Sequence, residues 1–242
     1  MQEHENALNP HLSVDCVVFG FTGEHLKVLL IERTTSSGKD YKLPGDFIYD
    51  TEDLQRAAER ILTNLTGLED LFLHQFAVFG RPDRVHAPED LQWLRETTGL
   101  PVNRVVTTAF FSLVRIDESK RENALRAGAS WHRVSSLPTL AFDHREIILA
   151  GQKALQKEVR FAPICFELLP GKFTIRQIQN LYEVILDHPL DNRNFRKKLL
   201  KAPYVVPLNE RQEGVAHKPA RFYRFDRELY ERSHSELYEY NF

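Results

Sequence analysis

Runs of β-branched and apolar residues in the first half of the chain predict a strand-rich domain. Residues 12–20 and 26–33 are two such runs, and the segment FTGEH between them predicts a β-hairpin. The polar segment at 34–40, TTSSGKD, is expected to be a loop. Residues 71–80 predict a further strand, and residues 105–116, the longest β-rich run, predict the centre of a sheet.

Apolar positions with helical spacing predict the helices of this half. Between Asp50 and Gly67 they recur at i, i+3, i+4, i+7, i+8 and i+11, which places them on one face of an amphipathic helix. We expect Asp50 or Thr51 to cap its start, and Gly67 to end it in a left-handed turn. A short helix is predicted at 88–97, and a helix at 143–158 should lead into the second half.

The second half has helical patterns followed by two short strands. A short helix near 160–169 precedes a helix capped by Thr174, and Asp191 caps a third. VVPLN and RFYRFD, joined by a polar turn, predict a hairpin. Three helices closed by a hairpin are the plan of a winged helix-turn-helix. The fold class is therefore α+β, with a mixed α/β domain at 1–150 and a winged helix, including a linker helix and tail, at 151–242.

The composition is that of a soluble globular protein, with 42% hydrophobic and 27% charged residues. No apolar run approaches the roughly 18 residues that span a bilayer, and the polar N-terminus does not resemble a signal peptide. Cys16 and Cys165 lie in apolar surroundings typical of reduced core thiols, and no CxxC or HxxxH pair indicates zinc. We expect a cytoplasmic protein.

Charge is segregated along the chain. Residues 160–224 carry twelve Lys and Arg against six Asp and Glu, whereas residues 1–159 carry eighteen against twenty-three. A basic module on an acidic body indicates a polyanion partner, and a solvated basic face is the alternative.

One stretch, LPGDFIYDTEDLQRAAERILTNLTGL from Leu43 to Leu68, resembles the Nudix box. That pattern is G-x5-E-x7-R-E-U-x-E-E-x-G-U, where U is aliphatic. With Asp46 in place of the first glycine, the remaining matches fall in register at Glu52, Arg60, Leu62, Gly67 and Leu68. The resemblance implies a mixed-sheet α/β/α sandwich in the first domain.

The departures from this box fall on its metal ligands. Nudix enzymes hold magnesium with glutamates at the positions of Ile61, Asn64 and Leu65, and aliphatic side chains offer no lone pairs to a hard cation. We therefore expect no metal, no cofactor and no diphosphate hydrolysis, with Glu52 and Arg60 serving as a structural ion pair. The alternative is an enzyme with an unorthodox metal site built from Glu52, Asp50 and Glu59.

A site without metal ligands can still bind an effector. In the resembled fold, loops border the substrate cleft. Tyr49 and Arg84 lie on these loops, together with several of the candidate residues named below. Because a carboxylate accepts from hydroxyls and repels phosphate, Asp46 favours a neutral, hydroxyl-rich ligand. Solvated loop charges are the simpler interpretation of each residue alone. The candidate effector-binding residues are His11, Asp15, Lys42, Asp46, Arg81 and Asp83.

The basic module has the chemistry of a DNA reader. The second helix of a helix-turn-helix enters the major groove. There Arg forms paired hydrogen bonds with guanine and Asn with adenine, while Lys neutralises phosphates. A solvated face, or an adaptor that touches protein or RNA, is the alternative. The candidate DNA-binding residues are Arg176, Arg193, Asn194, Arg196, Lys197, Lys218 and Arg221.

Together the two halves resemble the Nudix-related transcriptional regulators. LPGKFTIRQIQNLYEVIL, LDNRNFRKKL and KPARFYRF look like the second-domain signatures of that family. The resemblance implies a homodimeric repressor that releases double-stranded operator DNA when a small molecule binds, with the acidic tail as a helix in the dimer interface or a cap on its own domain. The opening segment looks most like the arabinose-responsive branch, so we expect a sugar effector. An effector from NAD metabolism such as ADP-ribose is the alternative.

Overall fold

The computed structural model describes residues 7–36, 38–85, 87–214 and 218–239. The chain divides into two compact units, Met1–Ala162 and Pro163–Phe242. The helix predicted at 143–158 belongs wholly to the first unit, whereas a division at residue 150 cuts through it. No helix in the described part of the chain is long and apolar enough to cross a membrane.

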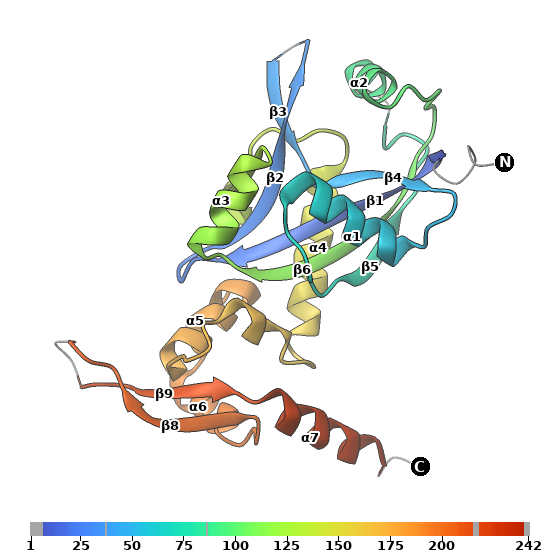
Figure 1. Cartoon of the computed structure of the whole chain (residues 1–242). Helices are drawn as coiled ribbons and strands as arrows, with labels where there is room; N and C mark the ends of the chain where they lie inside the picture. The colour runs from blue at the N-terminus through green and yellow to red at the C-terminus, as the bar shows by residue number, and fades with distance from the viewer. Residues whose placement is uncertain (1–6, 37, 86, 215–217, 240–242) are drawn as a thin grey trace. The chain divides into compact units, whose positions relative to one another are not determined.

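A seven-stranded mixed sheet forms the centre of the first unit (Figure 1). Its path is β3 (Gly38–Lys42), β2 (Leu26–Thr35), β1 (Leu8–Phe21), β6 (Val106–Arg115) and β5 (His74–Phe79), while β4 (Gly45–Tyr49) pairs with β1 and β7 (Ala129–Arg133) with β2. The predicted hairpin is β1 and β2. β6 lies between β1 and β5 and runs parallel to β1, so its predicted central place is confirmed.

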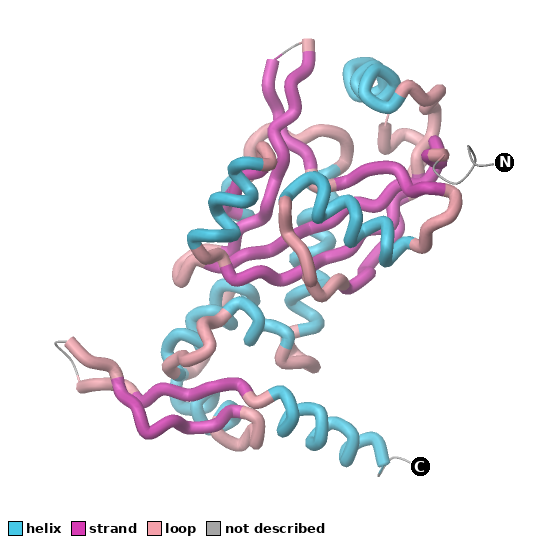
Figure 2. The backbone as a smooth tube through the Cα atoms, in the orientation of Figure 1, coloured by secondary structure: helices cyan, strands magenta, loops and turns pink. Residues whose placement is uncertain are grey.

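Helices cover both faces of the sheet, which gives the expected α/β/α sandwich (Figure 2). The covering helices are α1 (Leu54–Thr66), α3 (Glu118–Arg126) and α4 (His144–Glu158), whereas α2 (Pro88–Thr98) lies away from both faces. Cys16 and Val18 of β1 belong to the core beneath α1 and α3. Val17 and Phe19 point the other way and lie beside Gly151 of α4. Because successive strand side chains alternate between faces, β1 supplies both layers of the core.

The cap of α1 differs from the prediction. Asp53 is the N-cap, and its carboxylate accepts the N–H of Arg56 at 2.8 Å, whereas Asp50 and Thr51 precede the helix. The apolar spacing begins at Leu54, so the residue just before it is the one placed to cap. Gly67 ends the helix at a φ of 66°, as predicted.

Two regular segments lack the apolar pattern that would have predicted them. β3 occupies much of the segment expected to be a loop, because its polar side chains pair with those of β2. Lys39 Nζ lies 2.6 Å from Glu32 Oε1, and Asp40 pairs with Arg33. α3 buries only Ala124 among its residues.

The second unit is a winged helix, as predicted. Thr174 and Gln177 form a capping box at the start of α5, and Asp191 caps α6 by accepting the N–H of Asn194 at 2.8 Å. Its elements are η2 (Ile164–Leu168), α5 (Ile175–Leu186), α6 (Asn192–Leu199), β8 (Val205–Arg211), β9 (Arg221–Phe225) and α7 (Arg227–Glu239).

The first predicted helix of this unit is only the short 3₁₀ turn η2. Pro163 and Pro170 bracket the segment, which leaves too few residues for a stable α-helix. Phe166 of the turn stacks on Phe225 with 4.5 Å between ring centroids, so the segment still contributes to the core. The tail helix is present as α7. Its place in a dimer interface stays a prediction, because its side chains from residue 234 onward lie outside the described part.

Candidate functional site

The pair that keeps its place in the Nudix-box pattern, Glu52 and Arg60, connects the loop to the helix. Arg60 donates to both oxygens of Glu52, with Nε 2.9 Å from Oε2, and its Nη2 donates to Phe47 O at 3.0 Å. Glu52 also accepts the N–H of Tyr49 at 2.7 Å. Burial alone would raise the pKa of Glu52, but the hydrogen bonds from Arg60 and Tyr49 hold it below its usual value. The expected structural ion pair is confirmed.

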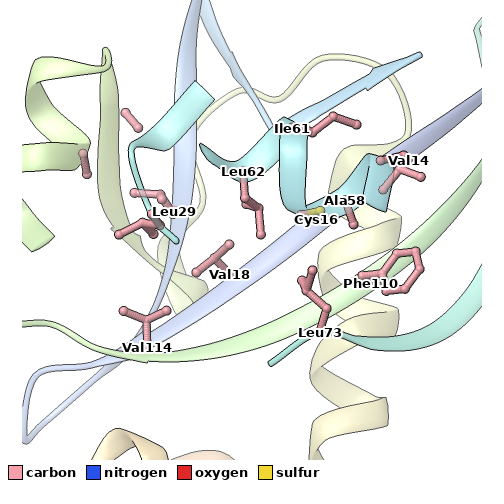
Figure 3. Close-up of a cluster of buried hydrophobic side chains, with 14 of the residues drawn as sticks. Val14, Cys16, Val18, Leu29, Ala58, Ile61, Leu62, Leu73, Phe110 and Val114 are labelled. Carbon is pink, nitrogen blue, oxygen red and sulfur yellow. The ribbon is translucent and has the colours of Figure 1, made fainter. Parts of the chain in front are cut away.

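The three positions that hold magnesium in Nudix enzymes do not form a ligand set here. Ile61 is 1% exposed and lies in the core (Figure 3). Leu65 packs against that core at the pocket edge, and Asn64 is exposed. Glu52 is already engaged by Arg60. Magnesium demands oxygen ligands at one point, so these residues do not fit it. Across the described residues, no group of three or more His, Cys, Asp or Glu is placed to hold a metal ion.

Beside the box helix lies a cavity of about 270 Å³, which we call the ligand pocket. Asp15, Lys42 and Asp46 line it, as expected, together with Arg84 and His144. The rest of its wall is mostly apolar and aromatic, from Phe47, Leu65, Val85, Trp93, Leu94, Val105 and Phe142. An apolar wall with a few convergent polar groups is typical of small-molecule sites.

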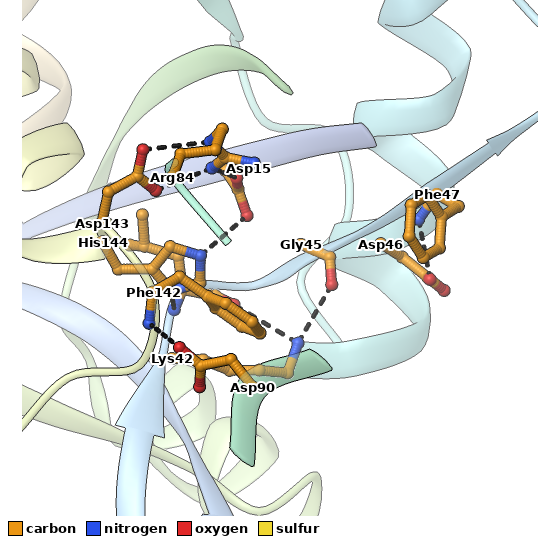
Figure 4. A network of polar contacts seen from close by, with 11 residues as sticks. Asp15, Lys42, Gly45, Asp46, Phe47, Arg84, Asp90, Phe142, Asp143 and His144 are labelled. Carbon is orange, nitrogen blue, oxygen red and sulfur yellow. Dashed lines mark hydrogen bonds and ion pairs between the residues drawn. The ribbon is translucent and has the colours of Figure 1, made fainter. Parts of the chain in front are cut away.

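A buried ion-pair network forms the polar end of the ligand pocket (Figure 4). Arg84 makes a two-pronged pair with Asp143, with Nε–Oδ2 at 3.0 Å and Nη2–Oδ1 at 2.8 Å. Its Nη2 also lies 3.5 Å from Asp15 Oδ2. All three side chains are at most 7% exposed. A guanidinium matches a carboxylate or a phosphate in this two-pronged geometry.

His144 completes the network in a defined tautomer. Its Nδ1 accepts the backbone N–H of Leu43 at 2.9 Å, so the ring proton resides on Nε2. Nε2 lies 3.4 Å from Asp15 Oδ1 and faces that carboxylate. Burial raises the pKa of Asp15, but His144 and Arg84 outweigh it and hold that pKa below its usual value.

Gly45 allows β4 to approach this carboxylate. A Cβ at Gly45 would lie 2.0 Å from Asp15 Oδ1 and 3.0 Å from Val14 O, both in a buried strand. The glycine of the LPG sequence is therefore required for close packing against Asp15.

Lys42 places a buried ammonium beside the pocket. Its Nζ donates to Gly45 O at 3.0 Å and lies 5.7 Å from the centre of the Trp93 ring. Among the described residues, no carboxylate oxygen lies within ion-pair distance of it. Burial lowers the pKa of Lys42, while the charges of Asp15 and Asp46 oppose that shift.

α2 brings Trp93 into the wall of the ligand pocket and Asp90 beside Arg33. Arg33 lies 5.3 Å from the Trp93 ring centre and 5.0 Å from that of Phe142, and it pairs with Asp90 at 2.7 Å. Phe142 has a φ of 53°, a left-handed backbone that costs an aromatic residue roughly 1–3 kcal/mol. Its N–H bonds Asp90 at 3.3 Å. The wall of the pocket is thus held by contacts between segments distant in sequence.

Three expected effector residues do not line the ligand pocket. Arg81 and Asp83 border a larger hollow of about 800 Å³, the outer hollow, and Arg81 pairs there with Glu146 at 3.2 Å. His11 is exposed, and its Nδ1 lies 3.3 Å from Arg104 O. The strand register explains His11, because β1 enters the sheet core only beyond Ser13. Sequence inspection had no signal for the partners that replace them, Trp93, Phe142, Asp143 and His144.

The second unit has a groove of about 650 Å³ that is lined by positively charged side chains, and we call it the basic groove. It lies between the starts of α5 and α6 and the β8–β9 hairpin, and its described lining contains no carboxylate. Its cations are Arg176, Arg196, Arg211, Lys218 and Arg221, of which all but Arg211 were expected.

The other predicted DNA-binding residues lie on α6 outside this lining. Arg193, Asn194 and Lys197 are all exposed on that helix, and residues 215–217 between the hairpin strands lie outside the described part. Arg221 is held in place because its Nε donates to Leu208 O at 2.7 Å. The groove therefore presents positive charge from two helices and the hairpin together.

Comparison with known proteins assigns both units. A NUDIX domain model matches residues 9–150. The chain belongs to the Nudix family. A model of the NrtR DNA-binding winged helix domain matches residues 165–225 of this Nudix-family chain. Its domain arrangement is therefore that of the NrtR-type Nudix-related regulators.

Two relatives and two solved structures illustrate the similarity. The Nudix-family chain is 27% identical to an ADPR-responsive transcriptional repressor of Acinetobacter baylyi, over 96% of this chain and 88% of that protein. It is 28% identical to an ADP-ribose pyrophosphatase of Methanocaldococcus jannaschii, over 61% of this chain and 76% of that protein. NrtR of Shewanella oneidensis, crystallised with a 27mer DNA, has a TM-score of 0.72 at 22% identity. The match covers 90% of this chain and 94% of that one. A MutT/nudix family protein of Enterococcus faecalis has a TM-score of 0.61 at 22% identity. The match covers 93% of this chain and 91% of that one.

Proposed function

We propose that this protein is a transcriptional repressor of the NrtR type that releases DNA when ADP-ribose, or a close chemical relative, fills the ligand pocket. The observation that carries the proposal is the joining of two features in one chain. The first is a Nudix domain whose metal-ligand positions hold Ile61 and Leu65. The second is a winged helix whose groove is lined by five cations. The Acinetobacter baylyi repressor, similar over 96% of this chain, supports the same assignment.

DNA binding rests on the charge and shape of the winged helix. Exposed arginines and lysines neutralise phosphates, and the exposed Arg193 and Asn194 at the start of α6 are suited to base edges. The basic groove suits the sugar-phosphate backbone beside that helix. In a homodimer, two such units would contact the two halves of a pseudo-palindromic operator.

ADP-ribose, the alternative effector, replaces the expected arabinose in this proposal. That expectation rested on the resemblance of the opening segment to the arabinose-responsive branch and on Asp46 as an acceptor. One oxygen of that carboxylate, Oδ1, accepts the N–H of Phe47 at 2.8 Å. Beside Asp15 and Asp46, the ligand pocket presents Lys42 and Arg84, and these two cations are of the kind that binds a diphosphate. The repressor relative is named for ADP-ribose, which favours the NAD-metabolite branch.

We further propose that the protein does not hydrolyse its effector. Without oxygen ligands at Ile61 and Leu65, no divalent ion is held to activate water or neutralise the diphosphate. ADP-ribose incubated with the protein and magnesium should remain intact under conditions in which a Nudix pyrophosphatase consumes it. Turnover that depends on Glu52 would restore the hydrolase alternative.

A DNA-release assay tests the proposed function. Duplexes selected from the genomic DNA of the source organism are labelled, and binding is followed by fluorescence anisotropy. We expect ADP-ribose to weaken binding at least tenfold, L-arabinose to have no effect, and Arg196→Ala to weaken binding by about 1–3 kcal/mol if Arg196 contacts a base. Failure to select any sequence, or release by L-arabinose but not by ADP-ribose, would contradict the proposal.

A further inference from the structure

Gln179 is a buried amide at the junction of α5 and α6. It is 3% exposed, and its Nε2 donates toward three oxygens, which are Glu183 Oε1 at 2.9 Å, Leu190 O at 3.1 Å and Asn192 Oδ1. Glu183 Oε1 also accepts the N–H of Leu190 at 3.0 Å. One amide and one carboxylate therefore hold the turn between the two helices from the inside.

These contacts fix the direction of two amides. The backbone oxygen of Leu190 can only accept. The hydrogen bonds from Leu190 and Gln179 hold the pKa of Glu183 below its usual value, so this carboxylate also accepts. The nitrogen of Gln179 must therefore face both groups. Because that nitrogen can only donate, the atom of Asn192 that meets it must be the oxygen.

The nitrogen of Asn192 is then turned away from Gln179 and remains available. Asn192 is exposed at the first position of α6 and lines the basic groove together with Arg176 and Arg196. Among the described residues, no acceptor lies within hydrogen-bond distance of Asn192 Nδ2. An oriented N–H donor in a groove whose described lining contains cations and no carboxylate is suited to an anion.

We infer that Asn192 donates to a phosphate of the DNA backbone and that Gln179 is the residue that positions it. This inference rests on the proposed function and adds a contact to its DNA-binding face. An asparagine that reads adenine uses its oxygen and its nitrogen together, and the oxygen of Asn192 is engaged by Gln179. A single N–H donor is suited to a phosphate oxygen, which carries no sequence information. Asn192 therefore supplies affinity rather than sequence preference.

Two substitutions at Asn192 separate a phosphate donor from a purely structural acceptor. Asn192→Ala removes both functions, whereas Asn192→Asp keeps an oxygen for Gln179 and places a carboxylate where the phosphate would lie. We expect Asn192→Ala to bind the selected DNA roughly tenfold more weakly than the wild type. Asn192→Asp should bind more weakly still, by about threefold or more at low salt, where repulsion is least screened. Fluorescence anisotropy measures both, and Asn123→Asp, the same change at an exposed asparagine of α3, should bind as the wild type does.

The dependence on salt and on sequence identifies the kind of contact. Because Asn192 is uncharged, Asn192→Ala should leave the salt dependence of the affinity unchanged. It should also weaken binding to the selected duplex and to an unrelated duplex by the same factor, as loss of a phosphate contact does.

A double-mutant cycle tests the positioning role. Gln179→Met removes the donor that orients Asn192, so it should weaken DNA binding. Adding Asn192→Ala to it should weaken binding no further than Asn192→Ala does alone, because both changes remove one interaction. Circular dichroism checks that each variant is folded. If Gln179→Met does not fold, the two substitutions at the exposed Asn192 decide the inference.

This inference and the proposed function fail in different ways. If the wild type selects no DNA, the repressor proposal is wrong. If the wild type binds DNA and ADP-ribose releases it, but Asn192→Ala binds as tightly as the wild type, the phosphate contact alone is wrong. Binding by Asn192→Asp at least as tight as by Asn192→Ala would show that Asn192 only accepts from Gln179. A loss confined to the selected sequence would show that it reads a base, and either result overturns the inference.

Discussion

At the scale of single residues, the ligand pocket is organised by buried charges that fix one another. Asp15 is the residue on which this organisation depends, because Arg84, His144 and the close approach of Gly45 all meet at its carboxylate. Burying a carboxylate is favourable only when partners replace its hydration. The network therefore stabilises the fold only while Asp15 is ionised.

This requirement predicts a pH-dependent stability. The folded pKa of Asp15 lies below its unfolded value, which is about 4 for an ordinary aspartate. Its contribution is therefore full above that value and is lost as the pH falls toward the folded pKa. Asp15→Asn should lower the unfolding free energy by about 1–3 kcal/mol at pH 7, and the difference should shrink below about pH 4.

Urea unfolding of both proteins across this pH range measures the difference. Glu69→Gln, at an exposed carboxylate, should show almost no difference from the wild type at any pH. A difference between Asp15→Asn and the wild type that grows as the pH falls would contradict the assignment.

At the scale of elements, α1 keeps the architecture of the Nudix helix with different chemistry on it. Its apolar spacing, its left-handed end at Gly67 and the Glu52–Arg60 pair all serve packing. Ile61 points into the core against the sheet. Restoring glutamates therefore tests whether the helix could still act as a metal platform.

Ile61→Glu should destabilise the protein by roughly 3–5 kcal/mol, because it places an unpaired carboxylate in the core. Asn64→Glu, three residues further on the exposed side, should change stability by less than about 0.5 kcal/mol. Chemical denaturation of the two variants gives the comparison. An Ile61→Glu protein as stable as the wild type would mean that Ile61 does not point into the core.

Elements with a regular apolar period could be predicted from the sequence, and the pocket could not. The spacing from Leu54 to Leu65 predicts α1, and Thr174 and Asp191 mark the starts of α5 and α6. β3 and α3 were not predicted, because their residues are polar on both faces or nearly so. The pocket joins Leu43 to His144 across about a hundred residues of chain, and no local pattern encodes such a contact.

At the scale of the whole molecule, the segregated charge gives each unit its own task. The first unit holds buried ion pairs, such as Arg33 with Asp40 and Arg84 with Asp143. The second unit leaves five cations around one groove. A cluster of surface cations attracts a polyanion over long distances, whereas buried ion pairs do not.

The basic groove predicts a strong salt dependence of DNA binding. Each phosphate neutralised releases counterions, so the logarithm of the affinity falls with the logarithm of salt concentration by about 0.9 per contact. Arg211→Ala removes an exposed groove cation that sequence inspection did not identify, and should reduce this slope by about 1 for each winged helix bound. Lys153→Ala, an exposed cation of the first unit, should leave the slope unchanged. Anisotropy titrations at several salt concentrations measure both, and equal slopes for Arg211→Ala and the wild type would place the phosphates outside the groove.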